Sequence, residues 1–103
     1  AVTNVVDNFK KAEEQIKDDP KNVSAWVTAG TIADTFGDDA LAEKAYKKAI
    51  ELDPSLFMAR NNLAALYLRQ EKYAQAETEY KIIFYGHQRS NRNSENKKNE
   101  NPK

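Results

Sequence analysis

Cysteine is absent from this sequence, and glycine and proline are scarce, with three of each among 103 residues. Without a thiol, the chain can form neither a disulfide bond nor a thiolate metal site. The scarcity of glycine and proline, together with plentiful Ala, Glu, Lys and Leu, favours helix. Long β-branched runs that alternate with polar residues are missing, so strands are not expected. These features predict an all-α fold in a chain of single-domain size.

Long hydrophobic runs are also missing. No apolar stretch approaches the roughly 20 residues that a membrane-spanning helix needs, so membrane insertion is not expected. The first residues, Ala1 to Asn4, lack the pattern of a signal peptide. The sequence leaves the compartment open, and a soluble, cytoplasmic location is the default expectation.

There is no excess of charge of one sign. Sixteen Lys and Arg residues balance 16 Asp and Glu residues, which gives no electrostatic reason to expect nucleic acid or an anionic membrane as the main partner. The distribution is uneven, because residues 1–86 carry 11 basic and 14 acidic side chains and residues 87–103 carry five and two. The latter segment has no large apolar side chain, so a polar, disordered tail is expected there. Its basic residues are sparse and lack interleaved aromatic residues, which disfavours nucleic-acid binding.

The side chains that enzymes need are poorly represented. The one histidine, His87, lies at the edge of the tail, and the three glycines form no phosphate-binding loop. Two acidic pairs, Asp18 with Asp19 and Asp38 with Asp39, fall at expected helix boundaries, where helix capping explains them. Adjacent residues on a helix also point apart. The sequence therefore predicts no enzyme, no catalytic residue, no metal and no cofactor.

Internal repetition is the strongest pattern in the chain. Many residues are identical to the residue 34 positions later. The identical pairs include Ile16 and Ile50, Asp19 and Asp53, Pro20 and Pro54, Ala40 and Ala74, Ala42 and Ala76, Glu43 and Glu77, and Tyr46 and Tyr80. A fixed period of this length is the signature of a repeat array.

Each repeat has the pattern of two helices, since large or apolar residues recur three or four positions apart. Gly37 suits the end of one helix, and Pro54 cannot continue a helix but fits the first turn of the next. The expected helices cover residues 2–17, 23–36, 40–52, 56–70 and 73–85. The chain is accordingly divided into a leading helix at 1–20, repeats at 21–55 and 56–86, and a tail at 87–103.

A set of small and aromatic residues marks both repeats. In the first repeat they are Trp26, Gly30, Ala42, Tyr46, Ala49 and Pro54, and in the second Leu63, Ala64, Tyr67, Ala76 and Tyr80. With this pattern the chain resembles the tetratricopeptide repeat over residues 23–86, and residues 2–20 match half a repeat. The residues that depart from the usual ones are Ala29, Ala33, Arg60, Ile83 and Gln88. The resemblance implies antiparallel helical hairpins stacked as a short right-handed superhelical array, with the four aromatic residues packed in its core.

The resemblance also implies a function in protein–protein interaction. In the family, the first helices of successive repeats line a concave groove that holds a peptide. The groove positions in this chain are Val27, Thr31, Asp34, Thr35, Asn61, Asn62, Ala65 and Arg69. Asn62 stands out because a side-chain amide can both donate to and accept from a peptide backbone. A carboxylate clamp for an acidic tail is not expected, because Val27 and Thr31 stand where that clamp has Lys and Asn.

The last expected helix offers a second candidate surface. It contains the run Ile82, Ile83, Phe84 and Tyr85, whereas repeat arrays normally end on a helix with a polar outer face. An apolar outer face indicates that a partner protein, a second copy of the chain or further repeats cover it. The sequence thus leaves three functions open: a module that binds a peptide or a partner's helix, a homo-oligomer joined through the last helix, and a fragment of a longer repeat protein.

Overall fold

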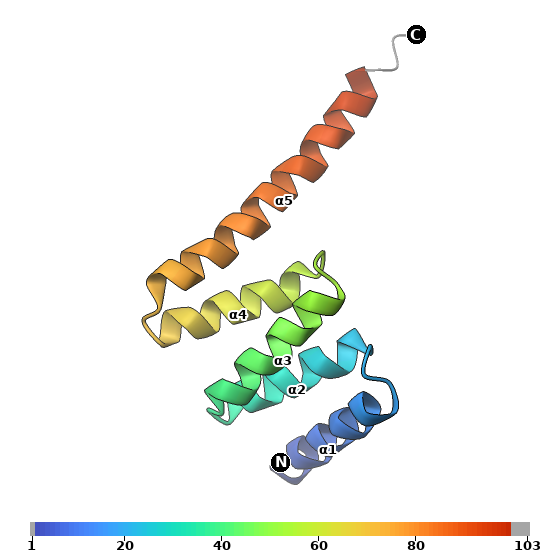
Figure 1. Cartoon of the computed structure of the whole chain (residues 1–103), viewed down its shortest axis with the longest axis vertical. Helices are drawn as coiled ribbons and strands as arrows, with labels where there is room; N and C mark the ends of the chain where they lie inside the picture. Colours follow the sequence, from blue (N-terminus) through green and yellow to red (C-terminus); the bar gives the residue numbers. More distant parts are fainter. Residues whose placement is uncertain (1, 100–103) are drawn as a thin grey trace.

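The computed structural model describes the backbone of residues 2–99 and the side chains of residues 5–86. Within this part of the chain, five helices and no strands are present (Figure 1). The helices are α1 (Val2–Asp18), α2 (Val23–Thr35), α3 (Asp39–Leu52), α4 (Phe57–Arg69) and α5 (Tyr73–Asn99). The predicted all-α fold is confirmed, and the first four helices begin and end within about one residue of their predicted positions.

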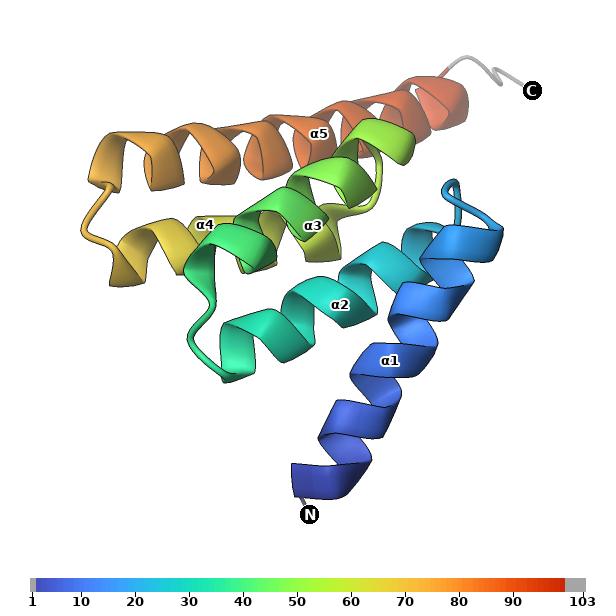
Figure 2. The ribbon, with the colours of Figure 1, turned by 60° about the horizontal axis from the view of Figure 1, so that its bottom comes forward.

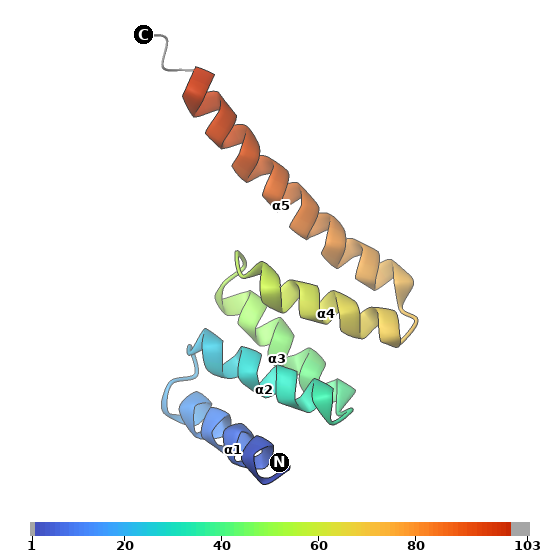
Figure 3. The same ribbon diagram turned by 180° about the vertical axis from the view of Figure 1, so that it is seen from behind.

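The helices stack in chain order. α2 pairs with α3 and α4 pairs with α5 as two antiparallel hairpins (Figure 2). α4 also packs against α3, which stacks the second hairpin on the first, and α1 packs against α2 (Figure 3). The result is a short right-handed superhelical array of hairpins, preceded by one helix that has no hairpin partner among the described residues.

The two hairpin turns have the same backbone geometry, although their sequences differ. Between α2 and α3, Gly37 has a φ of 81°, and the Asp38 amide donates to the Ala33 carbonyl at 2.8 Å. Glu71 takes the equivalent place between α4 and α5 with a φ of 61°, and the next amide closes the turn with a bond of the same 2.8 Å length. A left-handed conformation costs a non-glycine residue about 1 kcal/mol. The stacking of the second hairpin therefore imposes the turn on Glu71.

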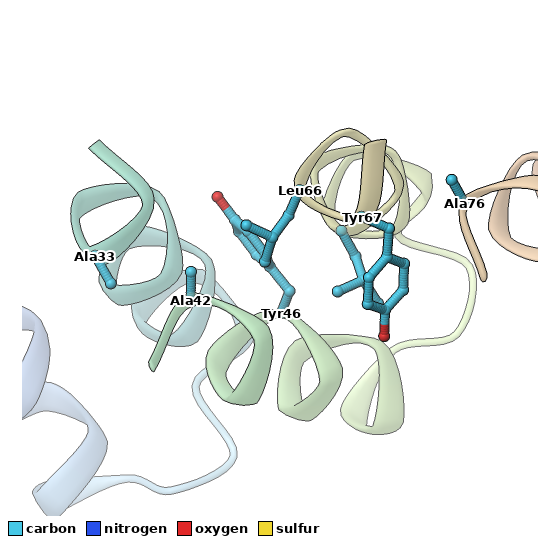
Figure 4. Packing of buried hydrophobic residues seen from close by; sticks show 7 residues of the cluster. Ala33, Ala42, Tyr46, Leu66, Tyr67 and Ala76 are labelled. Carbon is cyan, nitrogen blue, oxygen red and sulfur yellow. The ribbon is translucent and has the colours of Figure 1, made fainter. Parts of the chain in front are cut away.

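The core consists of two clusters of buried side chains. The larger cluster joins α2, α3, α4 and α5 and contains Ala33, Ala42, Tyr46, Leu63, Leu66, Tyr67 and Ala76 (Figure 4). The smaller cluster joins α1, α2 and α3 and contains Ala12, Ala29 and Ala45, with Phe9, Ile16 and Trp26 packed against it. Both clusters are rich in alanine, which allows close packing of the helices.

Gly30 is a point of close contact between α2 and α3. A Cβ atom at this position would lie 2.7 Å from Cε1 of Tyr46 and 3.3 Å from the Cβ of Ala45. Since Tyr46 is only 1% exposed, its ring has little room to move aside. The absence of a side chain at Gly30 therefore lets this ring lie between the two helices.

In the second hairpin, an ion pair replaces part of the apolar packing between the two helices. Arg60 on α4 occupies the position that Trp26 has on α2, one repeat earlier, and Glu79 occupies the position of Ala45. Nη1 of Arg60 lies 2.8 Å from Oε1 of Glu79, and the two side chains are only 12% and 16% exposed. The departure of Arg60 from the usual repeat pattern is thus accompanied by a carboxylate on the facing helix, where the first hairpin has Ala45.

The last helix is longer than predicted. From the sequence, this helix is expected to end near Tyr85, with a disordered tail from residue 87. In the structure, α5 continues through Gly86 to Asn99. A single glycine lowers helix stability by only about 1 kcal/mol relative to alanine, so Gly86 alone does not have to end the helix. Gly86 also has a packing role, because a Cβ atom there would lie 2.6 Å from Cζ of Phe57 on α4. Residues 100–103 lie outside the described residues, and the proposed division into domains remains a prediction.

The Arg60–Glu79 pair gives a first testable prediction. Replacing either residue with Ala should lower the free energy of unfolding by about 2 kcal/mol, because the remaining charge stays mostly buried without its partner. This loss is smaller than for a fully buried pair, since some solvent reaches both side chains. The double change Arg60→Trp with Glu79→Ala copies the first hairpin and should recover most of that loss. Urea unfolding followed by circular dichroism measures all three variants. A double variant that loses the sum of the two single losses would contradict this account.

Candidate functional site

The predicted groove residues occupy two neighbouring helices. Four of them lie on α2 and four on α4, and these two helices contact each other directly. None of the eight is fully buried. Thr31, Thr35, Asn61, Ala65 and Arg69 are exposed, and Val27, Asp34 and Asn62 are half-buried. The structure therefore makes all eight residues accessible on one pair of adjacent helices.

Two of the groove residues are engaged with each other. The Arg69 guanidinium of α4 forms an ion pair with Asp34 of α2, and it also lies 3.4 Å from Asp39 at the start of α3. The other Asp34 oxygen accepts a hydrogen bond of 3.3 Å from the Tyr46 hydroxyl. The hydrogen bond to Asp34 raises the pKa of the Arg69 guanidinium. The negative charge of Asp34 is therefore largely balanced by Arg69, and the carboxylate is poorly available to a partner's cation.

The threonine hydroxyls of the groove bond to their own helix. Thr31 donates to the Val27 carbonyl and Thr35 donates to the Thr31 carbonyl, both at 2.9 Å. Each hydroxyl has one proton and two lone pairs. Because the proton is engaged, the exposed oxygens of both residues are hydrogen-bond acceptors toward any ligand in the groove.

A hollow of about 430 Å³ lies where α1 meets α2. Val27 and Thr31 line it, as predicted groove residues, together with Thr28 and Ile32 of the same helix. From α1 it is lined by Asn8, Lys11, Ala12 and Gln15, which the sequence analysis did not select. A signal for them exists in the sequence, since Ala12 stands 34 positions before Tyr46. A methyl group in place of a phenol ring leaves space between two helices.

A second surface lies on the outward face of α5. A mostly apolar hollow of about 430 Å³ is formed there and at the end of α4. The lining residues are Leu68, Tyr73, Ala76, Glu77, Tyr80, Lys81, Phe84 and Tyr85. Phe84 and Tyr85 touch edge to face, with ring centroids 5.7 Å apart.

The structure places the predicted run of residues 82–85 on different sides of α5. Phe84 and Tyr85 belong to the apolar hollow, Ile83 is half-buried, and Ile82 is exposed but lies outside the hollow lining. Successive residues on a helix point in different directions, whereas residues three or four apart share a face. The spacing of Tyr73, Ala76, Tyr80 and Phe84 is the signal that finds this face.

Tyr80 corrects one expectation about the core. The sequence analysis placed all four aromatic repeat residues inside, and Tyr46 and Tyr67 are indeed buried, with exposures of 1% and 3%. Trp26 is half-buried and its indole N–H donates to the Pro20 carbonyl at 2.8 Å. Tyr80, however, is 39% exposed. Its equivalent Tyr46 is covered because α4 follows α3 in the stack, and no described helix covers α5 in that way.

The described residues contain no cluster of three or more His, Asp or Glu side chains that could hold a metal ion. In the same part of the chain, no helix is both long and apolar enough to cross a membrane. The chemistry on view consists of hydrogen-bonding and apolar side chains on helix faces. Such surfaces suit the binding of another molecule.

Comparison with known proteins agrees with this geometry. Two family models described as "Tetratricopeptide repeat" match residues 23–56 and 45–78, which together cover more than half of the chain. The first match coincides with the α2–α3 hairpin and the following turn, and the second runs from α3 into α5. The repeat period, the α2–α3 hairpin and the first of these matches therefore identify the same unit.

Among curated proteins, the chain is similar to Superkiller complex protein 3. The human protein is 39% identical over 65 residues, which are 63% of this chain, and the mouse protein is 38% identical over 59 residues, which are 57%. The matched segment spans only 4% of each relative. Among solved structures, MamA superposes with a TM-score of 0.78 at 18% identity, covering 82% of this chain and 49% of that chain. At this identity the likeness concerns the fold.

The buried tyrosines give a prediction about alkaline stability. Burial raises the pKa of Tyr46 above its ordinary value of 10.0, and the nearby Asp34 charge acts in the same direction. Below pH 10.0 the Tyr46 phenol keeps its proton in both the folded and the unfolded chain, so its titration does not change the free energy of unfolding. As the pH rises above it, the unfolded chain releases the proton more readily, and the free energy of unfolding should fall. Burial raises the pKa of Tyr67 too, which adds to the fall.

Urea unfolding at about pH 8 and at about pH 11 measures this dependence. Tyr46→Phe should reduce the difference between the two pH values, because one of the two buried phenols is removed. Tyr73→Phe is the matched control, since that ring is 62% exposed, and it should leave the difference unchanged. Equal effects of both substitutions would show that burial is not the cause.

Proposed function

This chain belongs to the tetratricopeptide repeat family, and we propose that it holds an extended segment of a partner protein along α2 and α4, with α1 as one wall. The repeat is generally a protein–protein interaction scaffold. The proposal adds the surface on which this chain binds a partner and the form of the bound segment. The observation that supports it best is the hollow between α1 and α2, which adjoins the predicted groove residues.

The lining of this hollow combines two kinds of side chain. Val27 and Ile32 offer apolar surface, and Asn8, Gln15 and Thr31 offer hydrogen-bonding groups. An extended peptide presents the same two kinds of group, because its amides need partners while its side chains need pockets. Asn62, half-buried on the next helix of the groove, extends the row of amides that can donate and accept at once.

Charge indicates which peptide fits. Lys11 is the one charged residue that lines the hollow, and the nearby carboxylate of Asp34 is already paired with Arg69. A segment with one apolar anchor and few charges, of which an acidic one would be the best tolerated, is therefore favoured. The curated relatives bear the name of a complex, which agrees with a role in assembly for a repeat of this kind.

A peptide array tests the groove. Immobilised ten-residue segments with varied sequence should include some that retain the chain, and their binding should weaken about five-fold with Asn62→Ala, as expected for the loss of one hydrogen bond. Thr31→Arg should weaken it more, because the longer side chain enters the hollow between α1 and α2. Lys44→Ala, at an exposed position of α3, serves as the control and should bind like the unchanged protein. Peptides that bind all four proteins equally would exclude this groove as the binding site.

A second function is supported by the apolar face of α5. The same face of α3, one repeat earlier, is covered by α4 and contains the buried residues Ala42 and Tyr46. On α5 the equivalent residues Ala76 and Tyr80 border an open hollow together with Phe84. Exposed apolar surface of this kind marks interaction sites. We infer that a second copy of the chain can cover it, with α5 packed against α5.

Light scattering over a range of protein concentrations measures this association. The molar mass should rise from the 11.7 kDa of one chain toward twice that value, and Phe84→Glu should return it to that of the monomer because a charge enters the apolar contact. Ile82→Glu is the matched control, since Ile82 is exposed on the same helix but outside the hollow. A single-chain mass at every concentration would rule out self-association as the role of this face.

A further inference from the structure

A smaller apolar pocket shares one lining residue, Ile32, with the α1–α2 hollow and none with the hollow on α5. It has a volume of about 240 Å³ and is formed by α1, the end of α2 and the start of α3. Its lining includes Val6, Phe9, Ile32, Ala33, Phe36 and Leu41. Val6 and Phe36 are 42% and 55% exposed at its mouth. The pocket is therefore an opening from the surface into the packed part of the molecule.

The repeat itself shows why the pocket exists. Ala33 stands 34 positions before Tyr67, whose side chain is only 3% exposed in the second hairpin. The neighbours of the Tyr67 ring correspond to the pocket lining. Lys72, whose ammonium lies 6.0 Å from the ring centroid, is equivalent to Asp38, which borders the pocket. Glu43, whose charge helps to raise the Tyr67 pKa, is equivalent to Phe9.

The position of the pocket between the two core clusters supports this explanation. Ala33 and Leu41 belong to or pack against the larger cluster, and Phe9 packs against the smaller one. In the second hairpin, one buried tyrosine ring fills the equivalent space. In the first hairpin, an alanine methyl group in its place leaves a gap between the clusters. The backbone geometry is nevertheless the same, as the shared turn closure at Ala33 and Tyr67 shows.

We propose that this pocket binds one uncharged aromatic side chain of a partner protein, at a site separate from the α2–α4 groove. The occupant is a ring because the same fold places a ring in the equivalent space of the next repeat. The size agrees, since a dry cavity of about 150 Å³ with a similar lining is large enough for benzene. Asp38 adds a polar edge. One of its oxygens accepts the Leu41 amide at 3.2 Å, and the carboxylate has further lone pairs for a phenol hydroxyl.

The probe for this site is p-cresol, which is the side chain of tyrosine as a free molecule. Titration of the full chain, followed by carbon–proton NMR of methyl groups, should give saturable shifts at Val6, Ala33 and Leu41, which line this pocket and not the α1–α2 hollow. The expected dissociation constant is on the order of 1 mM, as befits so small a ligand without a peptide attached. Shifts that grow linearly up to the solubility limit of p-cresol would overturn the proposal.

Filling the pocket from within provides the decisive variant. Ala33→Tyr restores the ring of the second hairpin and should weaken p-cresol binding at least ten-fold while keeping or raising the melting temperature. Ala74→Tyr makes the same change at an exposed alanine on α5, a helix that does not contact α1, and should bind p-cresol as before. If Ala33→Tyr does not fold, Ala33→Leu fills part of the same space and should show the same loss. Unchanged affinity in a folded Ala33 variant would refute the site.

Two further measurements separate this pocket from the other proposals. Asn62→Ala should bind p-cresol with unchanged affinity, because Asn62 is not part of the pocket lining; a ten-fold loss would show that the probe binds the groove. Light scattering with and without p-cresol tests occupation by a second copy. A dimer that dissociates when p-cresol is added would mean that an aromatic residue of this chain fills the pocket, which would overturn the assignment to a partner protein.

Discussion

Close approach of helix backbones is the constraint on which the rest of this structure depends. α3 lies between α2 and α4, and its fully buried residues are Ala42, Ala45 and Ala49, all with 0% exposure. Tyr46 is the one large residue in this row, and it fits because Gly30 on the facing helix has no side chain. Larger residues at these positions would separate the helices and remove the burial of Leu63 and Leu66. The small residues thus set the distance between neighbouring helices, and this distance determines which side chains fit between them.

The two hairpins fill this common spacing with different chemistry. The first places Trp26 against the smaller core cluster, with Ala45 on the facing helix. The second uses the Arg60–Glu79 pair at the same two positions, with N and O atoms 2.8 Å apart. An ion pair of this kind adds little net stability when compared with apolar packing, but it is costly to break. The residue at one position therefore constrains the residue at the other, which explains why the two hairpins differ at both positions together.

The fold could be predicted from the sequence because its signals are redundant. The fixed repeat period, the apolar spacing and the turn residues all indicate the same hairpins, and the first four helices end within about one residue of expectation. The end of α5 could not be predicted, since Gly86 resembles a helix end and its contact with Phe57 depends on tertiary packing. The groove positions follow from the repeat, but the Asp34–Arg69 pair that neutralises part of the groove depends on the angle between α2 and α4. The two hollows beside α1 were missed because they arise where Ala12 and Ala33 stand in place of the tyrosines of the next repeat.

A repeat array can acquire binding surfaces at positions where it lacks a large side chain. The α1–α2 interface has Ala12 and Ala33 where the next equivalent interface has Tyr46 and Tyr67. If the helices could close the resulting gaps, the two alanines would simply bring α1 nearer to α2. The gaps stay open in this structure, in which Phe9, Ile16 and Trp26 pack against the smaller cluster between α1, α2 and α3. Two missing rings therefore become two hollows, one beside the groove and one at the opposite edge of α1. In an array whose spacing is fixed by small residues, the loss of a large side chain creates a site, whereas in a core free to collapse it would only reduce stability.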